Sequence, residues 1–312
     1  MGFKCGIVGL PNVGKSTLFN ALTQTAAAEA ANFPFCTIEP NTGRVSVPDD
    51  RLDKIAAIAK SANIIPTQLE FVDIAGLVRG ASKGEGLGNQ FLANIRETDA
   101  IVHVLRCFED GDITHVDGSV DPVRDAETIE TELMLADMES LEKRVPALQK
   151  KARSNDKDAK LALDLIERAL VVLRDGQPAR VVEINGEDEE KAFRMLQLLT
   201  SKPILYACNV DEDSAAEGNE LSAKVAEMAA AQGARSVVIS AAIESEVALL
   251  ESAEDKKEFL EGLGLEETGL ARVIREGYKL LKLLTFFTVG PKEARAWTVH
   301  EGATAPNAAG VI

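Results

Sequence analysis

The chain has 312 residues, of which 46% are hydrophobic and 27% charged, and its formal net charge is −16. This length and composition allow a large buried core, and they predict a globular protein of about two domains or one domain with an insertion. The negative charge excludes a nucleic-acid coat held by bulk positive charge, although a local basic patch stays compatible with it. We therefore expect no DNA ligand.

The lack of a recognisable targeting signal and the spacing of the cysteines predict a cytoplasmic protein. The N-terminal apolar stretch leads directly into a glycine-rich turn and lacks a cleavage pattern, so a secretory signal is not expected. No uninterrupted apolar run is long enough to span a membrane. The cysteines lack C-x-x-C spacing, which suits reduced thiols; they are Cys5, Cys36, Cys107 and Cys208.

A phosphate-binding loop is indicated near the N-terminus, where residues 9–16 fit the pattern G-x-x-x-x-G-K-[ST]. In this pattern the backbone N–H groups surround a triphosphate, the lysine reaches the β and γ oxygens, and the hydroxyl ligates Mg²⁺. A plain glycine turn before a helix is the alternative, but the loop lies between an apolar strand and an amphipathic helix, as a phosphate loop requires. The predicted nucleotide-binding residues here are Asn12, Val13, Gly14, Lys15, Ser16 and Thr17, with Ser16 as a metal ligand.

Two later segments have the features of nucleotide-sensing switch loops. Residues 32–41 contain two prolines, which predict a loop, and Thr37 is its candidate ligand for Mg²⁺; a threonine that only opens the next strand is the alternative. The strand predicted at 67–73 ends in the D-x-x-G spacing of Asp73 and Gly76, which suits a carboxylate on a metal-bound water and an N–H near the γ-phosphate. The glycine-rich residues 78–89 predict a second switch loop.

The predicted chemistry is mostly positioning and charge neutralisation, with Lys15, Thr37 and Gly76 in the catalytic roles. Leu77 stands where Ras-like enzymes carry the glutamine that orients the attacking water. Because leucine cannot hydrogen-bond, we expect slow intrinsic hydrolysis. The water-orienting group stays open, and so does the participation of His115.

The strands predicted at 203–209 and 236–242 end where the base-reading loops of Ras-like folds lie. Residues 209–212 resemble the guanine motif N-K-x-D, but Val210 replaces the lysine and Glu212 the aspartate. That aspartate accepts from two guanine N–H groups, and a carboxylate one methylene further out is poorly placed to do so. Guanine specificity is therefore in doubt, and the predicted base-site residues are Asn209, Val210, Glu212, Ser240 and Ala241.

Residues 125–199 have helical apolar periodicity with interruptions at 154–156 and 175–178, which predicts a helical hairpin. A solvated helical surface is one interpretation of the basic residues near its turn, and a partner surface is the other. These residues are Lys143, Arg144, Lys150, Lys151, Arg153, Lys157 and Lys160. Downstream, we expect helices at 251–263 and 268–284 and then short strands at 285–290 and 296–299.

Taken together, these motifs resemble those of the YchF-type Obg-like ATPases. The resemblance spans essentially the whole chain and rests on residues 9–16, 32–37, 73–77, 83–92, Asn209-x-x-Glu212 and 295–298. It implies an α/β fold, in which a Ras-like P-loop NTPase sheet is interrupted by a coiled-coil helical hairpin and followed by a partial, β-rich TGS-type unit. The implied boundaries are 1–127 and 199–276 for the nucleotide-binding domain, 128–198 for the insertion, and 277–312 for the beginning of an incomplete TGS domain.

The resemblance also implies ATP as the preferred nucleotide, with Val210 against the adenine, and a ribosomal partner, RNA or protein. We therefore expect a slow Mg²⁺-dependent ATPase that works as a switch and does not bind membranes. A GTPase and a nucleotide-gated binding protein with incidental hydrolysis are the alternatives. A metabolite kinase is not expected, because the sequence gives no sign of a second substrate pocket. Asn12 stands where related potassium-stimulated proteins place a cation ligand, so K⁺ is a further hypothesis.

Overall fold

The computed structural model describes residues 3–30, 42–74, 87–111, 118–250 and 252–312, and omits the side chains of residues 24–30, 87, 89 and 253. Thr37, Gly76, Leu77, Cys36 and His115 therefore lie outside the described parts.

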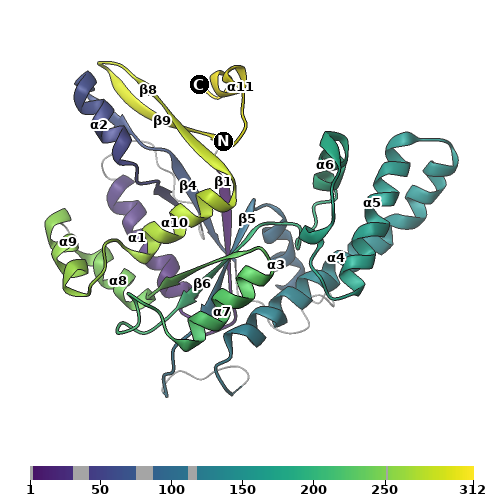
Figure 1. Ribbon diagram of the computed structural model, residues 1–312, viewed down its shortest axis with the longest axis horizontal. Coiled ribbons are helices and arrows are strands. Elements are labelled where there is room, and N and C mark those ends of the chain that lie inside the picture. The colour runs from purple at the N-terminus through teal and green to yellow at the C-terminus, as the bar shows by residue number, and fades with distance from the viewer. Residues whose placement is uncertain (1–2, 31–41, 75–86, 112–117, 251) are drawn as a thin grey trace.

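Within these ranges the main sheet has six strands in the order β2-β4-β1-β5-β6-β7 (Figure 1). β2 is antiparallel to β4, and the other neighbours are parallel. β5 is buried along its whole length, as expected for a parallel strand covered on both faces. The strand bounds are β1 Phe3–Val8, β2 Thr42–Ser46, β4 Gln68–Asp73, β5 Ala100–Arg106, β6 Ile204–Asn209 and β7 Arg235–Ile239.

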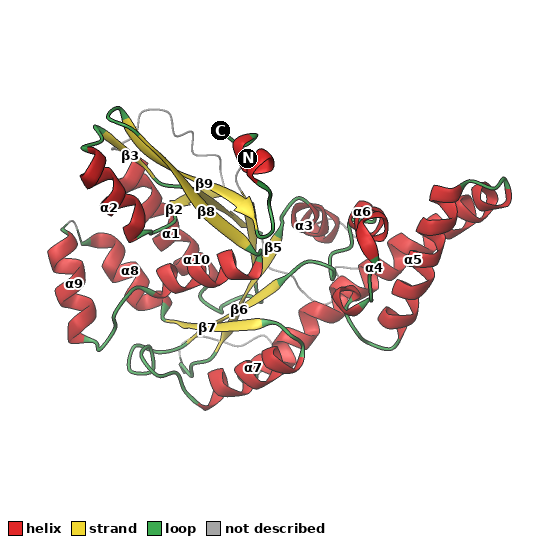
Figure 2. Ribbon diagram, turned by 45° about the horizontal axis from the view of Figure 1, so that its top comes forward, coloured by secondary structure: helices red, strands yellow, loops and turns green. Residues whose placement is uncertain are grey.

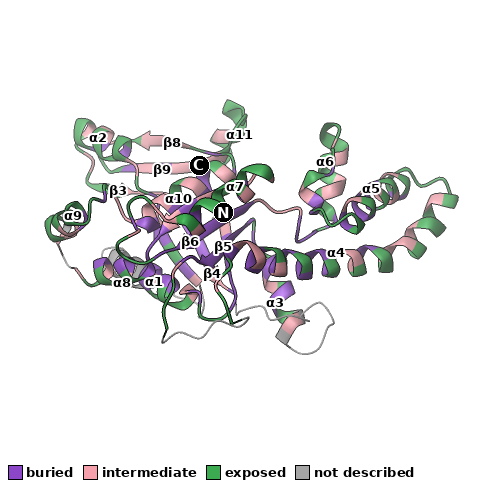
Figure 3. Cartoon of the chain, turned by 60° about the horizontal axis from the view of Figure 1, so that its bottom comes forward, coloured by how far each residue is buried: buried purple, intermediate pink, exposed green. Residues whose placement is uncertain are grey.

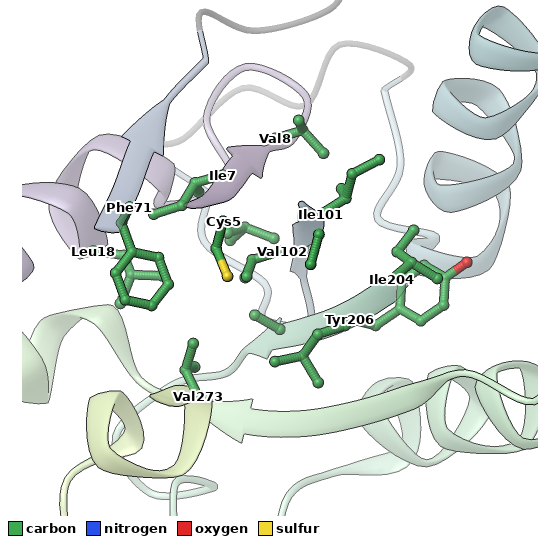
Figure 4. Close-up of a cluster of buried hydrophobic side chains, with 14 of the residues drawn as sticks. Cys5, Ile7, Val8, Leu18, Phe71, Ile101, Val102, Ile204, Tyr206 and Val273 are labelled. Carbon is green, nitrogen blue, oxygen red and sulfur yellow. The ribbon is translucent and has the colours of Figure 1, made fainter. Parts of the chain in front are cut away.

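Helices pack on this sheet through one large apolar core. Figure 4 shows side chains of β1, α1, β4, β5, β6 and α10 meeting there. His103 of β5 is buried in the sheet, and burial lowers its pKa to about 3, so it is neutral. The helices on this core are α1 Lys15–Ala30, α3 Leu87–Arg96, α7 Glu220–Ala231, α8 Ala241–Leu249 and α10 Gly269–Leu280, whereas α9, Ala253–Gly262, packs with α8 in a separate buried cluster. Nowhere in the described ranges does a helix combine the length and apolar character needed to cross a bilayer.

A helical hairpin of α4, Pro122–Arg153, and α5, Lys157–Arg174, projects from the sheet (Figures 2 and 3). Aspartates cap both helices: Asp121 accepts from the Arg124 N–H and Asp156 from the Ala159 N–H. The hairpin has its own apolar core, which α6, Gly186–Met195, joins through partly buried side chains. It is therefore a packed unit and not an isolated pair of helices.

The base of the hairpin is fixed by one buried carboxylate. Asp137 of α4 accepts hydrogen bonds from the N–H groups of Leu199 and Thr200, both at 2.8 Å, and from the Thr200 hydroxyl at 2.7 Å. Burial nevertheless raises the pKa of Asp137. A second contact, the ion pair of Glu130 in α4 with Arg180, adds a fixed point close to the sheet.

A small sheet of order β3-β9-β8 lies beside α2, Asp50–Ala59 (Figure 1). β8, Leu283–Val289, and β9, Glu293–His300, form an antiparallel pair, and β3, Asn63–Ile65, runs parallel to β9. A buried cluster joins this sheet to α2: Leu52, Ala56, Ala294 and Ala296. A short helix, α11 Ala305–Ala309, follows.

Some element boundaries differ from those predicted. The apolar periodicity of residues 50–62 predicts a helix over that range, but α2 ends at Ala59, because Lys60 takes a left-handed conformation with φ of 53° and closes it. The helix expected to reach residue 284 ends at Leu280, because residues 283–289 pair with β9. β7 ends at Ile239, three residues before the predicted strand end, and α8 begins at Ala241.

Candidate functional site

A cleft of about 1110 Å³ lies at the carboxyl ends of β1, β5 and β6. In a parallel sheet these ends share one edge, where ligands of α/β proteins bind. Within the described ranges, all predicted site residues except Val13 and Ser240 line the cleft. The lining residues among them are Asn12, Gly14, Lys15, Ser16, Thr17, Asp73, Asn209, Val210, Glu212 and Ala241. The structure thus brings the two predicted parts of the site, the phosphate loop and the base-site segment, into one cavity.

The phosphate loop is shaped by glycines that tolerate no side chain. Gly14 has a φ of +88°, and a Cβ on it would lie 2.2 Å from Nδ2 of Asn209. A Cβ on Gly9 would lie 2.8 Å from the carbonyl oxygen of Val104. Only glycine fits at these two positions, and its lack of a side chain allows the loop to lie close against β5 and β6.

Lys15, the first residue of α1, forms an ion pair with Asp73 at the end of β4. Both side chains are largely buried, with 10% and 20% of their area exposed. An ammonium group and a carboxylate in one cleft are the two charges that a metal–triphosphate complex would separate.

Asn209, the last residue of β6, ties the phosphate loop to the start of α8. Its Nδ2 donates to the carbonyl oxygen of Val13 at 3.0 Å, and its Oδ1 accepts from the N–H of Ala241 at 2.9 Å. The Val13 side chain is buried and does not line the cleft, and Val13 takes part in this link through its backbone carbonyl. Ser240 is also buried, and its hydroxyl has no hydrogen-bond partner among the described residues. Asn209 therefore braces two loops of the site, a function that its motif alone does not reveal.

The structure adds wall residues that the sequence analysis did not single out: Leu10, Pro11, Phe108, Glu109, Asp110, Asp211, Asp213 and Ala242. Those from residues 108–110 directly follow β5. A signal for them is present, because the continuous apolar run at 100–108 predicts a buried strand, and the carboxyl end of such a parallel strand must share the edge of the sheet with the phosphate loop.

The thiols of Cys107 and Cys208 lie at the carboxyl ends of β5 and β6 and do not line the cleft. Hydrogen bonding with Cys208 and then burial raise the pKa of the Cys107 thiol. Since the thiolate is the reactive form, the Cys107 thiol is inert as a nucleophile.

Comparisons with known proteins match this architecture. A family model described as a 50S ribosome-binding GTPase matches residues 4–135. The model named YchF-GTPase_C, described as a protein of unknown function, matches residues 283–312. The chain is 60% identical to the Ribosome-binding ATPase YchF of Haemophilus ducreyi over 312 residues, which cover 100% of this chain and 85% of that protein. The chain belongs to the YchF family.

Other YchF proteins show the same relation. The Ribosome-binding ATPase YchF of Bacillus subtilis is 54% identical over 314 residues, with 100% of this chain and 85% of that protein covered. A solved structure, described as that of the Schizosaccharomyces pombe YchF GTPase, is 37% identical, and its TM-score is 0.86 with 99% of this chain and 84% of that chain covered. The YchF resemblance and the P-loop NTPase fold predicted from the sequence are therefore confirmed.

Proposed function

We propose that this chain is a Mg²⁺-dependent ATPase that acts as a nucleotide-controlled switch and binds the ribosome. The observation that carries the proposal is the shared cleft, in which Lys15 and Ser16 lie together with the segment of Asn209, Val210 and Glu212. The first two residues suit a triphosphate, and the other three suit a base other than guanine. The relatives named Ribosome-binding ATPase support the same reaction and partner.

The base preference follows from what the three residues can offer. Both hydrogen bonds of the Asn209 carboxamide described above are internal, so at most one N–H stays available to a base. Val210 is apolar and Glu212 is exposed. Without the lysine and the aspartate of the guanine motif, little is left that would favour guanine over adenine.

The donor set of the cleft fits Mg²⁺ as part of a nucleotide complex. Among the described residues, no group of three His, Cys, Asp or Glu side chains could hold a metal by itself. Ser16 supplies a hydroxyl as a hard oxygen ligand, Asp73 supplies a carboxylate that could hold a metal-bound water, and phosphate oxygens and water would provide the other ligands. When bound, the ion would neutralise charge on the β and γ phosphates.

The residues of the chain would act by positioning. Lys15 would leave Asp73 for the β and γ oxygens, Asp73 would accept from a metal-bound water, and Ser16 and Thr37 would ligate the ion. Gly76 would sense the γ-phosphate through its N–H. With Leu77 at the position of the usual glutamine, turnover is expected to be slow.

Competition calorimetry with ATP and GTP tests the base. We expect ATP to bind at least about tenfold more tightly, a difference of about 1.4 kcal/mol. Glu212→Asp should narrow the difference, because it restores the carboxylate reach of the guanine motif, whereas Asp213→Glu on the same exposed segment should not. Tighter binding of GTP by the wild type would instead support the GTPase alternative. The Schizosaccharomyces pombe structure is described as that of a GTPase, which favours this alternative.

Single-turnover cleavage of ATP, measured with and without ribosomes, separates a working ATPase from a nucleotide-gated binding protein. A working ATPase should cleave bound ATP, and ribosomes should change the rate. Ribosome binding that depends on ATP without any cleavage would support the binding protein. A ribosomal partner also places the protein in the cytoplasm under this proposal.

A further inference from the structure

The loop that follows β5 forms part of the wall of the cleft. Phe108, Glu109 and Asp110 all line it. The loop begins beside the base-site segment, because Arg106 is in register with Asn209 and the Cys107 N–H donates to the Asn209 carbonyl at 2.8 Å. Its conformation therefore affects the same end of the cleft as Asn209.

One buried guanidinium holds this loop. The side chain of Arg106, at the end of β5, belongs to a residue that is 1% exposed. Its Nε donates to the carbonyl of Phe108 and its Nη2 to the carbonyl of Asp110, both at 3.1 Å. Its Cζ also lies 4.7 Å from the centre of the Phe108 ring. Arg106 thus fixes both the backbone and the ring of a residue that lines the cleft.

A second support acts on the start of the loop alone. Nδ2 of Asn219 donates to the carbonyl of Cys107 at 2.7 Å. Asn219 is itself fixed at the N-terminus of α7 by reciprocal hydrogen bonds with Ser222. None of its hydrogen bonds to described residues reaches Phe108 or Asp110, so Asn219 offers a matched comparison with Arg106.

Burying a guanidinium costs free energy, and an apolar side chain could fill the end of β5 without that cost. An apolar residue, however, offers neither directed donors nor a flat cationic surface for an aromatic ring. We propose that Arg106 is a positioning residue for the nucleotide base: it holds the Phe108 ring at the cleft in the orientation that the face of a purine requires. The proposal rests on the proposed function only in that the cleft binds a nucleotide.

This role predicts that a change of Arg106 alters the binding of the base and leaves the binding of the phosphates unchanged. Lys15 and the phosphate loop would bind the triphosphate through other atoms, and Arg106 does not line the cleft itself. The affinity for ATP should therefore depend on Arg106, whereas the affinity for inorganic tripolyphosphate should not. A side chain that only stabilises the domain would change both affinities by the same factor.

The experiment measures the binding of Mg²⁺-ATP and of Mg²⁺-tripolyphosphate to the full chain by calorimetry. Arg106→Lys keeps the charge but loses the planar fork, and we expect about a tenfold loss for ATP and less than a twofold change for tripolyphosphate. In a Phe108→Ala background, Arg106→Lys should add no further loss. Asn219→Ala should leave the ratio of the two affinities as in the wild type.

Equal losses for both ligands would overturn the proposal, and so would a full effect of Arg106→Lys in the absence of the Phe108 ring. If Arg106→Lys does not fold, Phe108→Leu gives the answer without touching the buried charge, because an unchanged affinity ratio would leave the ring without a role. Wild-type protein that binds ATP and tripolyphosphate equally well would overturn this proposal alone. Binding of neither ligand would refute the nucleotide assignment itself.

Discussion

Lys15 and Asp73 form an ion pair inside the cleft, although their elements, α1 and β4, are far apart in the sequence. The pair holds the cationic and anionic groups of the site in mutual contact. A metal–triphosphate complex would have to separate them, and each would gain a partner of opposite charge.

Lys15→Ala should abolish tight triphosphate binding and leave the fold intact. The ammonium group is directed at the cleft, and the loss of two charge-assisted hydrogen bonds to phosphate, each worth about 1.5–3 kcal/mol, corresponds to about a 100-fold or greater loss of affinity. Calorimetry with ATP and far-UV circular dichroism check the two parts. Lys292→Ala, on an exposed turn, is the control, and near-wild-type affinity of the Lys15 variant would refute the phosphate-loop assignment.

Glu70 links three strands, because its carboxylate contacts Lys4 of β1 and Arg44 of β2, each at 3.0 Å and each directly across the sheet. Burial acts to raise the pKa of Glu70, but the hydrogen bonds from Lys4 and Arg44 outweigh it and the pKa is lowered. Both cations are about half exposed, so solvent screens the pairs. Glu70→Gln should therefore cost only about 1 kcal/mol of unfolding free energy at pH 7.

The pH dependence has a definite sign. A lowered pKa in the folded state adds stability above the ordinary glutamate pKa of about 4.3, and this stability is lost as the pH falls through the folded value. Urea unfolding from pH 7 to pH 3 should show the difference between wild type and Glu70→Gln shrinking in acid. The control is Glu97→Gln at an exposed position, which should leave the unfolding free energy close to that of the wild type. A destabilisation by Glu70→Gln that grows in acid would contradict the stabilising role of the Glu70 carboxylate.

We predict that the turn of the helical hairpin contacts ribosomal RNA. Lys150, Lys151 and Arg153 are exposed, and none forms an ion pair with a described residue, whereas Lys143 pairs with Glu139 and Arg144 donates to the Leu196 carbonyl. Replacing the first three by glutamate should weaken ribosome cosedimentation and reduce its dependence on salt, because each phosphate contact releases counterions.

The matched control for this surface changes three lysines outside the hairpin to glutamate: Lys54, Lys256 and Lys257. Both triple variants alter the net charge equally, so only a local contact distinguishes them. ATP affinity should be unchanged in both. If the hairpin variant cosediments like the wild type across a salt series, the basic turn is a solvated surface.

Asn12 lines the cleft with a positive φ of 65°. If its carboxamide helps to hold a monovalent cation beside the phosphates, the added charge would take the place of an arginine finger. Hydrolysis should then be at least about tenfold faster in K⁺ than in Na⁺ at equal ionic strength. Asn12→Gly tolerates the same backbone conformation and should remove the difference. Equal wild-type rates in the two salts would contradict the hypothesis.

The sequence predicted the parts of the fold and site that depend on local pattern. Continuous apolar runs identify the central strands, and spacing alone identifies the phosphate loop. The likeness of residues 209–212 to the guanine motif of Ras-like folds also predicted Asn209 as a base-site residue. What it did not predict depends on tertiary contacts: Leu283 and Leu284 continue a helical apolar stripe, and only pairing with β9 makes them a strand. Arg106 was missed for the same reason, because no periodicity identifies a buried arginine at a strand end.

Strand β3 has a consequence for how the protein is made. Its three residues pair with β9, which is synthesised some 230 residues later, and at about 5–20 residues per second this is a delay on the order of ten seconds or more. During that interval the apolar face of α2 lacks Ala294 and Ala296, which cover it in the finished protein. The small sheet thus closes late on the nascent chain, and its strand β3 has to wait for β9.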